Sequence, residues 1–487
     1  MLEGACELPV LRRTPMFNQK NQSTDAPFLE KIVRIIAFTL LGFVGFACVA
    51  RPAAAQNYNY PLETGYLRLS DRLQGHVPNG QSIVMGQVEA DVVSGTYLPD
   101  FTNPAFSPVN FQIEDGSGQV LTHATDVGRI LYGQDLSLTH GIAQVKLYRA
   151  DFYGGGFLFS PQELNWIDPA GPVNIGVDVL NNSWASNTGI QDLSTQLVRR
   201  MDWLADAYDI VVACGVPNDA TAPMPELMSS MYNGITVGVS SGPSTHGPTS
   251  FQETNGVTAG RCKPDIVAPM PVTSAAVPLI SSYAALLLDE VHQRTAAGQA
   301  NFVKGVKPAV IKSILQTGAN KLPGWAATET APLDFQQGAG QVDIDHSELI
   351  LSAGRELPGW ISSIGWTYEE NVAPADTRLY YFILNESTAK RFAATLNWHR
   401  KITSTGVTRT VDIASLAHLQ LEFYTFANGA FSLLQASRSP VDNLQHICLP
   451  TLANGIYILR VINPGDLVAD YALSWGCLPV TESNLGP

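Results

Sequence analysis

Up to residue 355, apolar residues occur in short runs that alternate with longer segments of helical spacing. Six of the short runs predict buried strands: Ile83–Val88, Lys146–Tyr148, Val177–Leu180, Ile210–Ala213, Ile235–Val239 and Asp265–Ala268. Four longer segments predict helices: Thr122–Tyr132, Ser194–Tyr208, Ser274–His292 and Lys307–Thr317. Short buried strands that alternate with helices are typical of an α/β fold with three layers and a parallel sheet. Functional residues in such folds lie at the carboxyl ends of the strands.

The pattern changes after Gly359, where helical spacing largely disappears. Strand-like segments recur, separated by Gly, Asn, Pro and Ser: Arg378–Leu384, Arg391–His399, Leu419–Thr425, Ile456–Ile462 and Asp470–Trp475. Many short strands between turn residues predict an all-β sandwich of the jelly-roll type. The chain is therefore expected to hold an α/β domain over residues 56–355 and a β-sandwich over residues 360–480.

The N-terminal region has the pattern of a targeting segment. Basic residues precede an apolar stretch, 35–50, which leads into three alanines at 53–55. This order predicts a secretory signal peptide over residues 1–55, with cleavage before Gln56. A membrane anchor is the alternative, but the apolar stretch is short for a span. We therefore expect an exported protein, extracellular or periplasmic, with no stable membrane span after cleavage.

Composition limits the classes of partner. Apolar residues make up 45% of the 487 residues and charged residues 15%, which is typical of a globular chain. Without the predicted leader, 23 basic and 39 acidic residues remain, a net charge of −16. Binding to nucleic acid or to an anionic membrane requires clustered Lys and Arg. We therefore expect neither partner, and we expect a monomer.

Four cysteines follow the predicted leader, and none has the spacing of a metal site. They are Cys214, Cys262, Cys448 and Cys477. In an oxidising compartment, Cys448–Cys477 is the first candidate for a disulfide, because both residues lie in the predicted sandwich. Four buried free thiols fit the sequence equally well.

The residues Thr273-Ser274 open an alanine-rich apolar helix, with Pro278 four residues after the serine. A hydroxyl at this position lies beside the free N–H groups and the positive end of the helix dipole. These groups favour the negative charge that develops when the hydroxyl attacks a carbonyl. Taken alone, the block also fits an ordinary helix start.

A histidine and an acid occur upstream in settings that such a serine would need. His123 lies at the start of the predicted helix Thr122–Tyr132, where it could accept a proton if a carboxylate fixed its tautomer. Glu89 follows the strand Ile83–Val88 and would lie at the carboxyl edge of the sheet. Asp91 is the alternative acid. Either residue could instead be a solvated surface group.

An amide donor follows another predicted strand. Asn218 comes shortly after Ile210–Ala213, where Gly215 and Pro217 end the strand. Its side-chain N–H could donate to a developing oxyanion, although an Asn at a strand end is more often a turn residue.

Together these segments resemble the subtilisin-like serine proteases, the subtilases. The family's G-T-S-x-A-x-P element is matched at Thr273, Ser274, Ala276 and Pro278, and its H-G-T-x-V-A-G element at His123, Thr125 and Val127. Weaker matches are the substrate-binding strand Leu180–Trp184, the K-P-D-x-x-A-P segment Lys263–Pro269 and the closing G-x-G element Gly338–Gly340. The resemblance covers residues 75–350, and the acid–His–Ser order fits it. Several short motifs in register are far more specific than any one of them.

The resemblance implies a role for each residue. Ser274 would be the nucleophile, His123 the general base and Glu89 the acid that orients the imidazole. Asn218 and the N–H of Ser274 would form the oxyanion hole. An extended substrate would pair with a strand formed by Ser183, Trp184 and Ala185. Substrates would be polypeptides, and no cofactor is implied. Structural calcium is common in the family but cannot be read from these residues.

The chain departs from the family pattern at four positions. Val272 replaces the Gly before Thr-Ser, Ala124 replaces the Gly after His, and Glu89 replaces Asp. Val216 stands where the family's oxyanion Asn is expected, and Asn218 follows two residues later. The leading hypothesis is an exported serine endopeptidase. A catalytically inactive scaffold that serves as an extracellular binding protein is the alternative, and an esterase or transpeptidase is a third.

Overall fold

The structure, a computed structural model, describes residues 59–91, 93, 95–150, 156–165, 168–254, 259–388, 390–405 and 411–479. All of these residues belong to one compact unit. The predicted leader, residues 1–55, lies outside the described residues, as does residue 480 at the end of the predicted sandwich.

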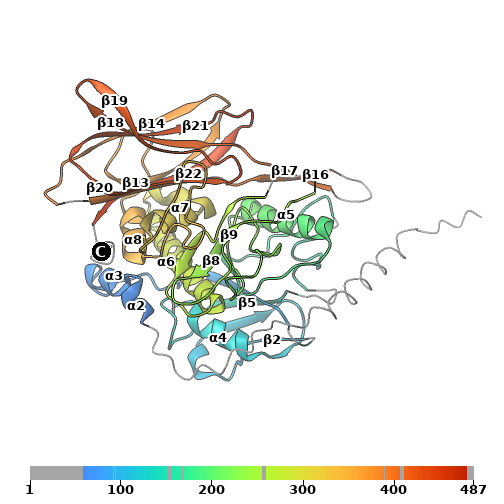
Figure 1. Cartoon of the computed structure of the whole chain (residues 1–487). Coiled ribbons are helices and arrows are strands. Elements are labelled where there is room, and N and C mark those ends of the chain that lie inside the picture. The colour runs from blue at the N-terminus through green and yellow to red at the C-terminus, as the bar shows by residue number, and fades with distance from the viewer. Residues whose placement is uncertain are drawn as a thin grey trace, which may run out of the picture. The chain divides into compact units, whose positions relative to one another are not determined.

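A seven-stranded parallel sheet forms the centre of the α/β part (Figure 1). Its strands, from one edge to the other, are β11 (Ile266–Ala268), β8 (Ile235–Val239), β7 (Val211–Gly215), β6 (Val179–Asn182), β1 (Val84–Glu89), β5 (Gln144–Arg149) and β3 (Asn110–Ile113). Every residue of β6, β7 and β8 is buried, because helices cover both faces of a parallel sheet. The predicted α/β class is confirmed.

The main helices are α4 (Thr122–Leu131), α5 (Gln191–Ala207), α6 (Thr273–Ala296), α7 (Pro308–Gly318) and α8 (Ile344–Ser352). Helix α6 is apolar on nearly all sides, as expected of a helix that is buried all round. By length and composition it could cross a membrane, but 94% of its most apolar stretch is buried inside the protein. It is therefore the core helix of the unit.

Two short helices, α2 (Tyr60–Glu63) and α3 (Tyr66–Arg72), precede the first strand. Hydrogen bonds join this segment to α8 and α6. Arg72 Nε donates to Asp345 Oδ1 at 2.8 Å, and the Ile344 N–H donates to the Thr64 carbonyl at 2.8 Å. The hydroxyls of Thr64 and Tyr283 are hydrogen bonded. This segment therefore packs as part of the folded core.

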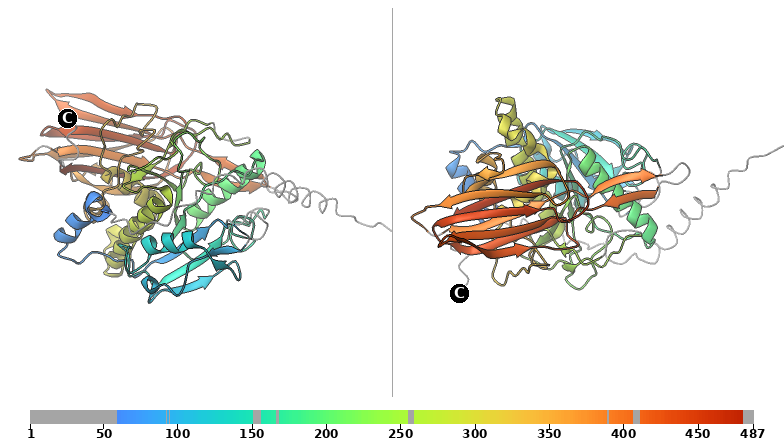
Figure 2. Two further views of the ribbon diagram at one scale, coloured as in Figure 1. Left: turned by 60° about the horizontal axis from the view of Figure 1, so that its bottom comes forward. Right: turned by 90° about the horizontal axis from the view of Figure 1, so that it is seen from above.

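The C-terminal part contains two mainly antiparallel sheets (Figures 1 and 2). One has the order β12 (Gly359–Trp360), β14 (Thr377–Leu384), β21 (Gly455–Ile462), β18 (Gln420–Ala427) and β19 (Ala430–Ser437). The other has the order β13 (Ile364–Val372), β22 (Ala469–Pro479), β15 (Lys390–Asn397) and β20 (Leu444–Leu452). Stacked rings fill the space between the sheets, with 4.1 Å between the centroids of Phe392 and Phe423. The predicted all-β region is confirmed.

The four-stranded sheet is buried on both faces. One face meets the five-stranded sheet, and the other packs against α7 (Figure 1). There the Thr317 hydroxyl lies 2.7 Å from the hydroxyl oxygens of both Thr395 and Ser474. Asn397 Nδ2 donates to Gln316 Oε1 at 2.7 Å. The α/β part and the sandwich therefore share a continuous buried contact.

A hairpin of β16 (Lys401–Thr405) and β17 (Val411–Ser415) extends from the sandwich along α5 (Figure 1). Beneath it lie six buried ionisable side chains that we call the buried charge cluster: Arg199, Arg200, Asp202, Glu253, Arg400 and Asp412. Arg200 holds Asp412 through Nε at 2.5 Å and Nη2 at 2.9 Å. Arg400 binds Asp202 at 2.5 Å and Glu253 at 2.6 Å. The cluster thus joins the hairpin to the α/β part through paired charges.

The prediction of a Cys448–Cys477 disulfide is wrong, because both thiols are free. Strand β15 runs between their two strands, with Ala393 opposite Cys448 and Phe392 opposite Cys477. Two strand spacings separate backbones by about 9–10 Å, beyond the reach of a disulfide. Because neighbouring residues of β15 point to opposite faces, the two thiols also lie on opposite sides of the sheet.

Candidate active site

The structure places Glu89 and His123 in direct contact. Glu89 is the last residue of β1, and His123 is the second residue of α4. His123 Nδ1 lies 2.8 Å from Glu89 Oε2. The carboxylate can only accept, so Nδ1 carries the proton and Nε2 is left as the basic nitrogen. The contact therefore produces the tautomer that a general base needs.

Solvent access differs between the two side chains. The Glu89 side chain is 2% exposed and the His123 side chain 36%. Burial by itself lowers the pKa of His123, but the charge and hydrogen bond of Glu89 raise it, so that the pKa lies above its ordinary value. The acid is thus shielded, while the imidazole remains accessible and binds a proton more readily.

Asp91, the alternative acid, lies elsewhere. It is buried, and its Oδ2 accepts a hydrogen bond from the Gly95 N–H at 3.0 Å. The carboxylate that meets His123 is therefore that of Glu89.

Ser274 lies in the first turn of α6 and is partly exposed. Among the described residues, neither its N–H nor its hydroxyl has a hydrogen-bond partner. Its carbonyl would normally bond the N–H four residues on, but Pro278 has none, and the carbonyl accepts instead from the Ser183 hydroxyl at 3.4 Å. The missing N–H of Pro278 thus leaves the Ser274 carbonyl free to bond Ser183, in the segment that follows β6.

Val272, which replaces the family's Gly, precedes this turn in an extended conformation, with φ −140° and ψ 149°. These are dihedrals that a β-branched residue readily adopts, so no glycine is needed here. Ala124 is fully buried in α4, in a position without a positive φ. Neither substitution disturbs the backbone around the candidate site.

Asn218 is fixed against the residue before the serine. Its Oδ1 accepts from the Thr273 N–H at 2.7 Å and from the Thr273 hydroxyl at 3.0 Å. A backbone N–H can only donate, so the amide oxygen must face Thr273 and the amide nitrogen must face away. Within the described ranges this Nδ2 group has no acceptor. Asn218 and Ser274 therefore each present an uncommitted N–H donor.

The predicted substrate strand continues from β6. Ser183 and Trp184 are largely buried, while Ala185 is partly exposed. Ser186, the next residue, exchanges two 2.9 Å hydrogen bonds with Leu227. In the described part of the chain, the backbones of Ser183 and Ala185 make no hydrogen bond. The backbone groups of Ser183 and Ala185 are therefore uncommitted within the described ranges.

Sequence reasoning missed Gln87 and Tyr132, both buried beside Glu89. Gln87 Nε2 donates to Glu89 Oε1 at 2.9 Å and to the Ala124 carbonyl at 2.9 Å. Tyr132 donates to Gln87 Oε1 at 2.6 Å. The signal in the sequence is a polar residue two positions before the acid in an apolar strand, since residues i and i+2 share a face.

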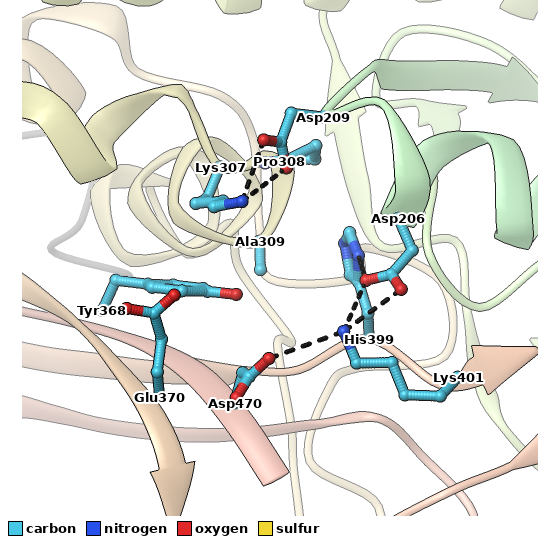
Figure 3. Close-up of a pocket in the computed structure, with 10 residues that line it drawn as sticks. All are labelled: Asp206, Asp209, Lys307, Pro308, Ala309, Tyr368, Glu370, His399, Lys401 and Asp470. Carbon is cyan, nitrogen blue, oxygen red and sulfur yellow. Dashed lines mark hydrogen bonds and ion pairs between the residues drawn. The ribbon is translucent and has the colours of Figure 1, made fainter. Parts of the chain in front are cut away.

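A separate pocket lies between the α/β part and the sandwich (Figure 3). None of the predicted site residues lines it. Lys307 pairs with Asp209 at 2.9 Å, and Lys401 pairs with Asp206 at 2.9 Å and Asp470 at 3.5 Å (Figure 3). His399 Nδ1 lies 3.1 Å from Asp206. The charged groups of this pocket largely pair with one another, as in a structural interface.

In the described part of the chain, no group of three or more His, Cys, Asp or Glu side chains is arranged to hold a metal ion.

Comparison with known proteins gives a family and several structures of low similarity. The model of the subtilase family matches residues 107–340, and no curated protein matches the chain. Among solved structures, the patellamide maturation protease PatG is 15% identical over 60% of this chain and 96% of its own, with a TM-score of 0.39. A lanthipeptide protease is 14% identical over 60% and 97%, with a TM-score of 0.37. The epidermin leader peptide processing protease EpiP from Staphylococcus aureus is 14% identical over 54% and 75%, with a TM-score of 0.35.

The matched segment contains His123, Asn218 and Ser274. The structure brings His123 to Glu89 and Asn218 to the residue before Ser274, whereas His123 and Ser274 make no hydrogen bond with each other among the described residues. Glu89 lies before the segment and meets it through His123. Residues 107–340 of this chain therefore form a domain of the subtilase family, a family of serine proteases.

Proposed function

We propose that the protein is an exported serine endopeptidase that hydrolyses peptide bonds through an acyl-enzyme on Glu89, His123 and Ser274. The observation that carries the proposal is the 2.8 Å hydrogen bond between Glu89 and His123 Nδ1. It leaves Nε2 free to accept a proton, in a domain whose family model also spans Ser274. Secretion is inferred from the sequence of residues 1–55 alone.

In this mechanism, the Ser274 hydroxyl attacks the carbonyl carbon of the scissile peptide bond while His123 Nε2 takes its proton. The imidazolium that forms is stabilised by Glu89. Collapse of the tetrahedral intermediate breaks the C–N bond, and His123 returns the proton to the leaving amine. Water, deprotonated by His123, then attacks the acyl-enzyme and releases the acid product with Ser274 restored.

Two uncommitted donors support an oxyanion hole. The Ser274 N–H lies in the first turn of α6, where the helix dipole favours negative charge. Asn218 Nδ2 faces away from Thr273, whose N–H holds the amide oxygen. Donors fixed before the reaction stabilise the developing oxyanion without reorganisation. The two-residue displacement of Asn218 from the family position is thus compatible with the same task.

The proposed substrate class is supported by the backbones of Ser183 and Ala185, which make no hydrogen bond within the described ranges. An extended polypeptide could pair with these residues as an added strand, which recognises main chain rather than a particular side chain. We propose polypeptide substrates cut at internal bonds, outside the cytoplasm, by a monomeric enzyme that needs no cofactor for the chemical step.

The test is hydrolysis of quenched fluorescent peptides by the full secreted protein. Wild type should release fluorescence from internal cleavage, Ser274→Ala should not, and Ser282→Ala should retain activity. Ser282 is a matched control because it is a buried serine of the same helix whose hydroxyl donates to the Ile130 and Leu131 carbonyls. Folded wild type that cleaves no peptide but turns over esters would favour an esterase. Inactivity on both substrates would favour the non-catalytic scaffold.

A further inference from the structure

We propose that Gln87 is a positioning residue for the triad, which fixes Glu89 against His123, and that Tyr132 sets the orientation of the Gln87 amide. This inference rests on the role proposed above for Glu89. It concerns how a glutamate, longer by one methylene than the aspartate of the family pattern, is held at the correct distance from the histidine.

The strand geometry brings Gln87 to the acid. Gln87 and Glu89 are two residues apart on β1, so their side chains project from the same face. Gln87 Nε2 reaches Glu89 Oε1 at 2.9 Å, while Glu89 Oε2 reaches His123 Nδ1 at 2.8 Å. Both carboxylate oxygens are therefore occupied, which restricts the additional torsion of the longer side chain.

The same amide group also fixes the histidine segment. The second proton of Gln87 Nε2 goes to the carbonyl of Ala124, the residue after His123, at 2.9 Å. One amide thus joins the acid at the end of β1 to the first turn of α4. Gln87 sets the relative position of the two elements that carry Glu89 and His123.

Tyr132 determines which way the amide points. Its hydroxyl donates to Gln87 Oε1 at 2.6 Å, and both groups near Nε2 are acceptors. A flipped amide would set oxygen against the carboxylate and the carbonyl, so only one orientation satisfies every partner. Gln87 and Tyr132 are each at most 1% exposed, so bulk solvent does not compete for these hydrogen bonds.

Gly128 makes room for this arrangement. A Cβ atom added there would lie 2.5 Å from the Tyr132 hydroxyl oxygen and 2.8 Å from the ring carbon that bears it. These distances are far below van der Waals contact. The same Cβ atom would also lie 3.1 Å from Cζ of the Phe106 ring. The missing side chain therefore lets the Tyr132 ring lie across α4 and reach Gln87.

The experiment compares Gln87→Met, Tyr132→Phe and the control Ser282→Ala in the full secreted protein. Methionine keeps the length of Gln87 but cannot donate to Glu89. The first readout is the pKa of His123, measured by NMR titration of histidine-labelled protein, which requires no turnover. The second is the separation of kcat from KM on a peptide substrate.

We expect Gln87→Met to release Glu89 and to lower the His123 pKa toward or below its ordinary value, because Glu89 is what raises it. The kcat should fall by about 10- to 100-fold with KM unchanged, as when the partner that orients a functional side chain is removed. Tyr132→Phe should produce a smaller change in the same direction. Ser282→Ala should leave both readouts at their wild-type values.

An unchanged His123 pKa and kcat in both Gln87→Met and Tyr132→Phe would overturn the inference, as would equal losses in Ser282→Ala. If Gln87→Met does not fold, Tyr132→Phe, which keeps the ring, decides between these outcomes. If wild type cleaves nothing while the His123 pKa still falls in the variants, the positioning role stands and the proposed function fails.

Discussion

The candidate active site and the buried charge cluster both contain buried ionisable side chains, but they use their hydrogen-bonding groups differently. In the cluster, Asp412, Asp202 and Glu253 each meet a guanidinium. At the site, within the described ranges, the Ser274 N–H and hydroxyl and the Asn218 Nδ2 group have no partner. Paired charges join two parts of the fold, whereas uncommitted donors at the start of α6 remain available to a bound group.

Solvent access shows the same difference. The cluster side chains are 0–3% exposed, while His123 is 36% exposed beside a Glu89 that is 2% exposed. A completely buried charge depends on its partner, because removal of that partner leaves an uncompensated charge away from water. A triad needs a shielded acid and an accessible base. The expected consequences of substitution therefore differ in kind. Substitutions in the buried charge cluster should lower stability, and substitutions in the candidate active site should lower the rate.

The largest expected effect is on rate, from His123→Ala. Removal of the base from a triad lowers kcat by about 10⁶-fold, equivalent to about 8 kcal/mol. Because the His123 side chain is partly exposed and Glu89 keeps the hydrogen bond from Gln87, the loss of thermal stability should be small. Peptide hydrolysis measures the loss of kcat, and a thermal melt on the same sample measures the stability. A residual rate within tenfold of wild type would remove His123 from the mechanism.

Asp412→Ala should give the opposite result, a large loss of stability with the rate per folded molecule unchanged. It leaves Arg200 buried without its carboxylate, which typically costs about 3–5 kcal/mol. Denaturant unfolding measures the loss. The matched control is the double variant Arg200→Met with Asp412→Leu, which removes both charges and should recover much of the stability. Equal losses in the single and double variants would contradict the assignment.

Asn218→Ala should lower kcat by about 10²- to 10³-fold with little change in KM, as expected for loss of one oxyanion donor. Steady-state kinetics on a peptide substrate measure the two constants separately. Thr221→Ala, which removes a hydroxyl that donates to Asp219 in the same loop, is the control. If Asn218→Ala raises KM instead, Asn218 contributes to substrate binding and not to the transition state.

A smaller effect should appear with pH at the pocket of Figure 3. Burial alone raises the pKa of Asp206, but its bonds to His399 and Lys401 lower it to about 2, below the ordinary 3.8. The stability that this carboxylate adds is therefore present above pH 4 and is lost as pH falls toward 2. The difference in unfolding free energy between wild type and Asp206→Asn should be larger near pH 6 than below pH 2 by an amount on the order of 2 kcal/mol. A difference independent of pH would show that ionisation of Asp206 is not involved.

The smallest effect is expected for Val272→Gly, which restores the family residue. Because Val272 is extended, glycine offers no conformation that is needed, and it makes the unfolded chain more flexible. Stability should fall by about 1–2 kcal/mol, because glycine also loses the partial packing of Val272 against the core, and kcat should stay within about threefold of wild type. A large gain in kcat would mean that the valine does obstruct the nucleophile.

Regular elements and the contact between acid and histidine could be anticipated from sequence, because they depend on local periodicity and on the chain order of strand ends. The predicted strand Ile235–Val239 and the observed β8 coincide. Helices α2 and α3 were missed because segments of 4 and 7 residues are too short to show a helical period. Gln87 was missed because one polar residue in an apolar strand looks like an interruption.

Features that depend on distant pairing could not be predicted. Arg200 and Asp412 are 212 residues apart in sequence, and nothing local to either residue indicates the other. The disulfide prediction failed for the same reason, because it required the register of β15 between β20 and β22. Sequence distance indicates that two cysteines share a region, whereas only the sheet order shows that a strand separates them.

Labelling with a fluorophosphonate, followed by peptide mapping, tests the central claim most directly. The reagent forms a stable adduct only with a serine whose hydroxyl is activated by a base beside an oxyanion hole. Folded wild type should take up one adduct per molecule, on Ser274, while Ser274→Ala takes up none and Asp412→Ala is labelled in proportion to its folded fraction. Wild type that is folded but unlabelled, or labelled on another residue, would contradict the assignment of Ser274 as the nucleophile.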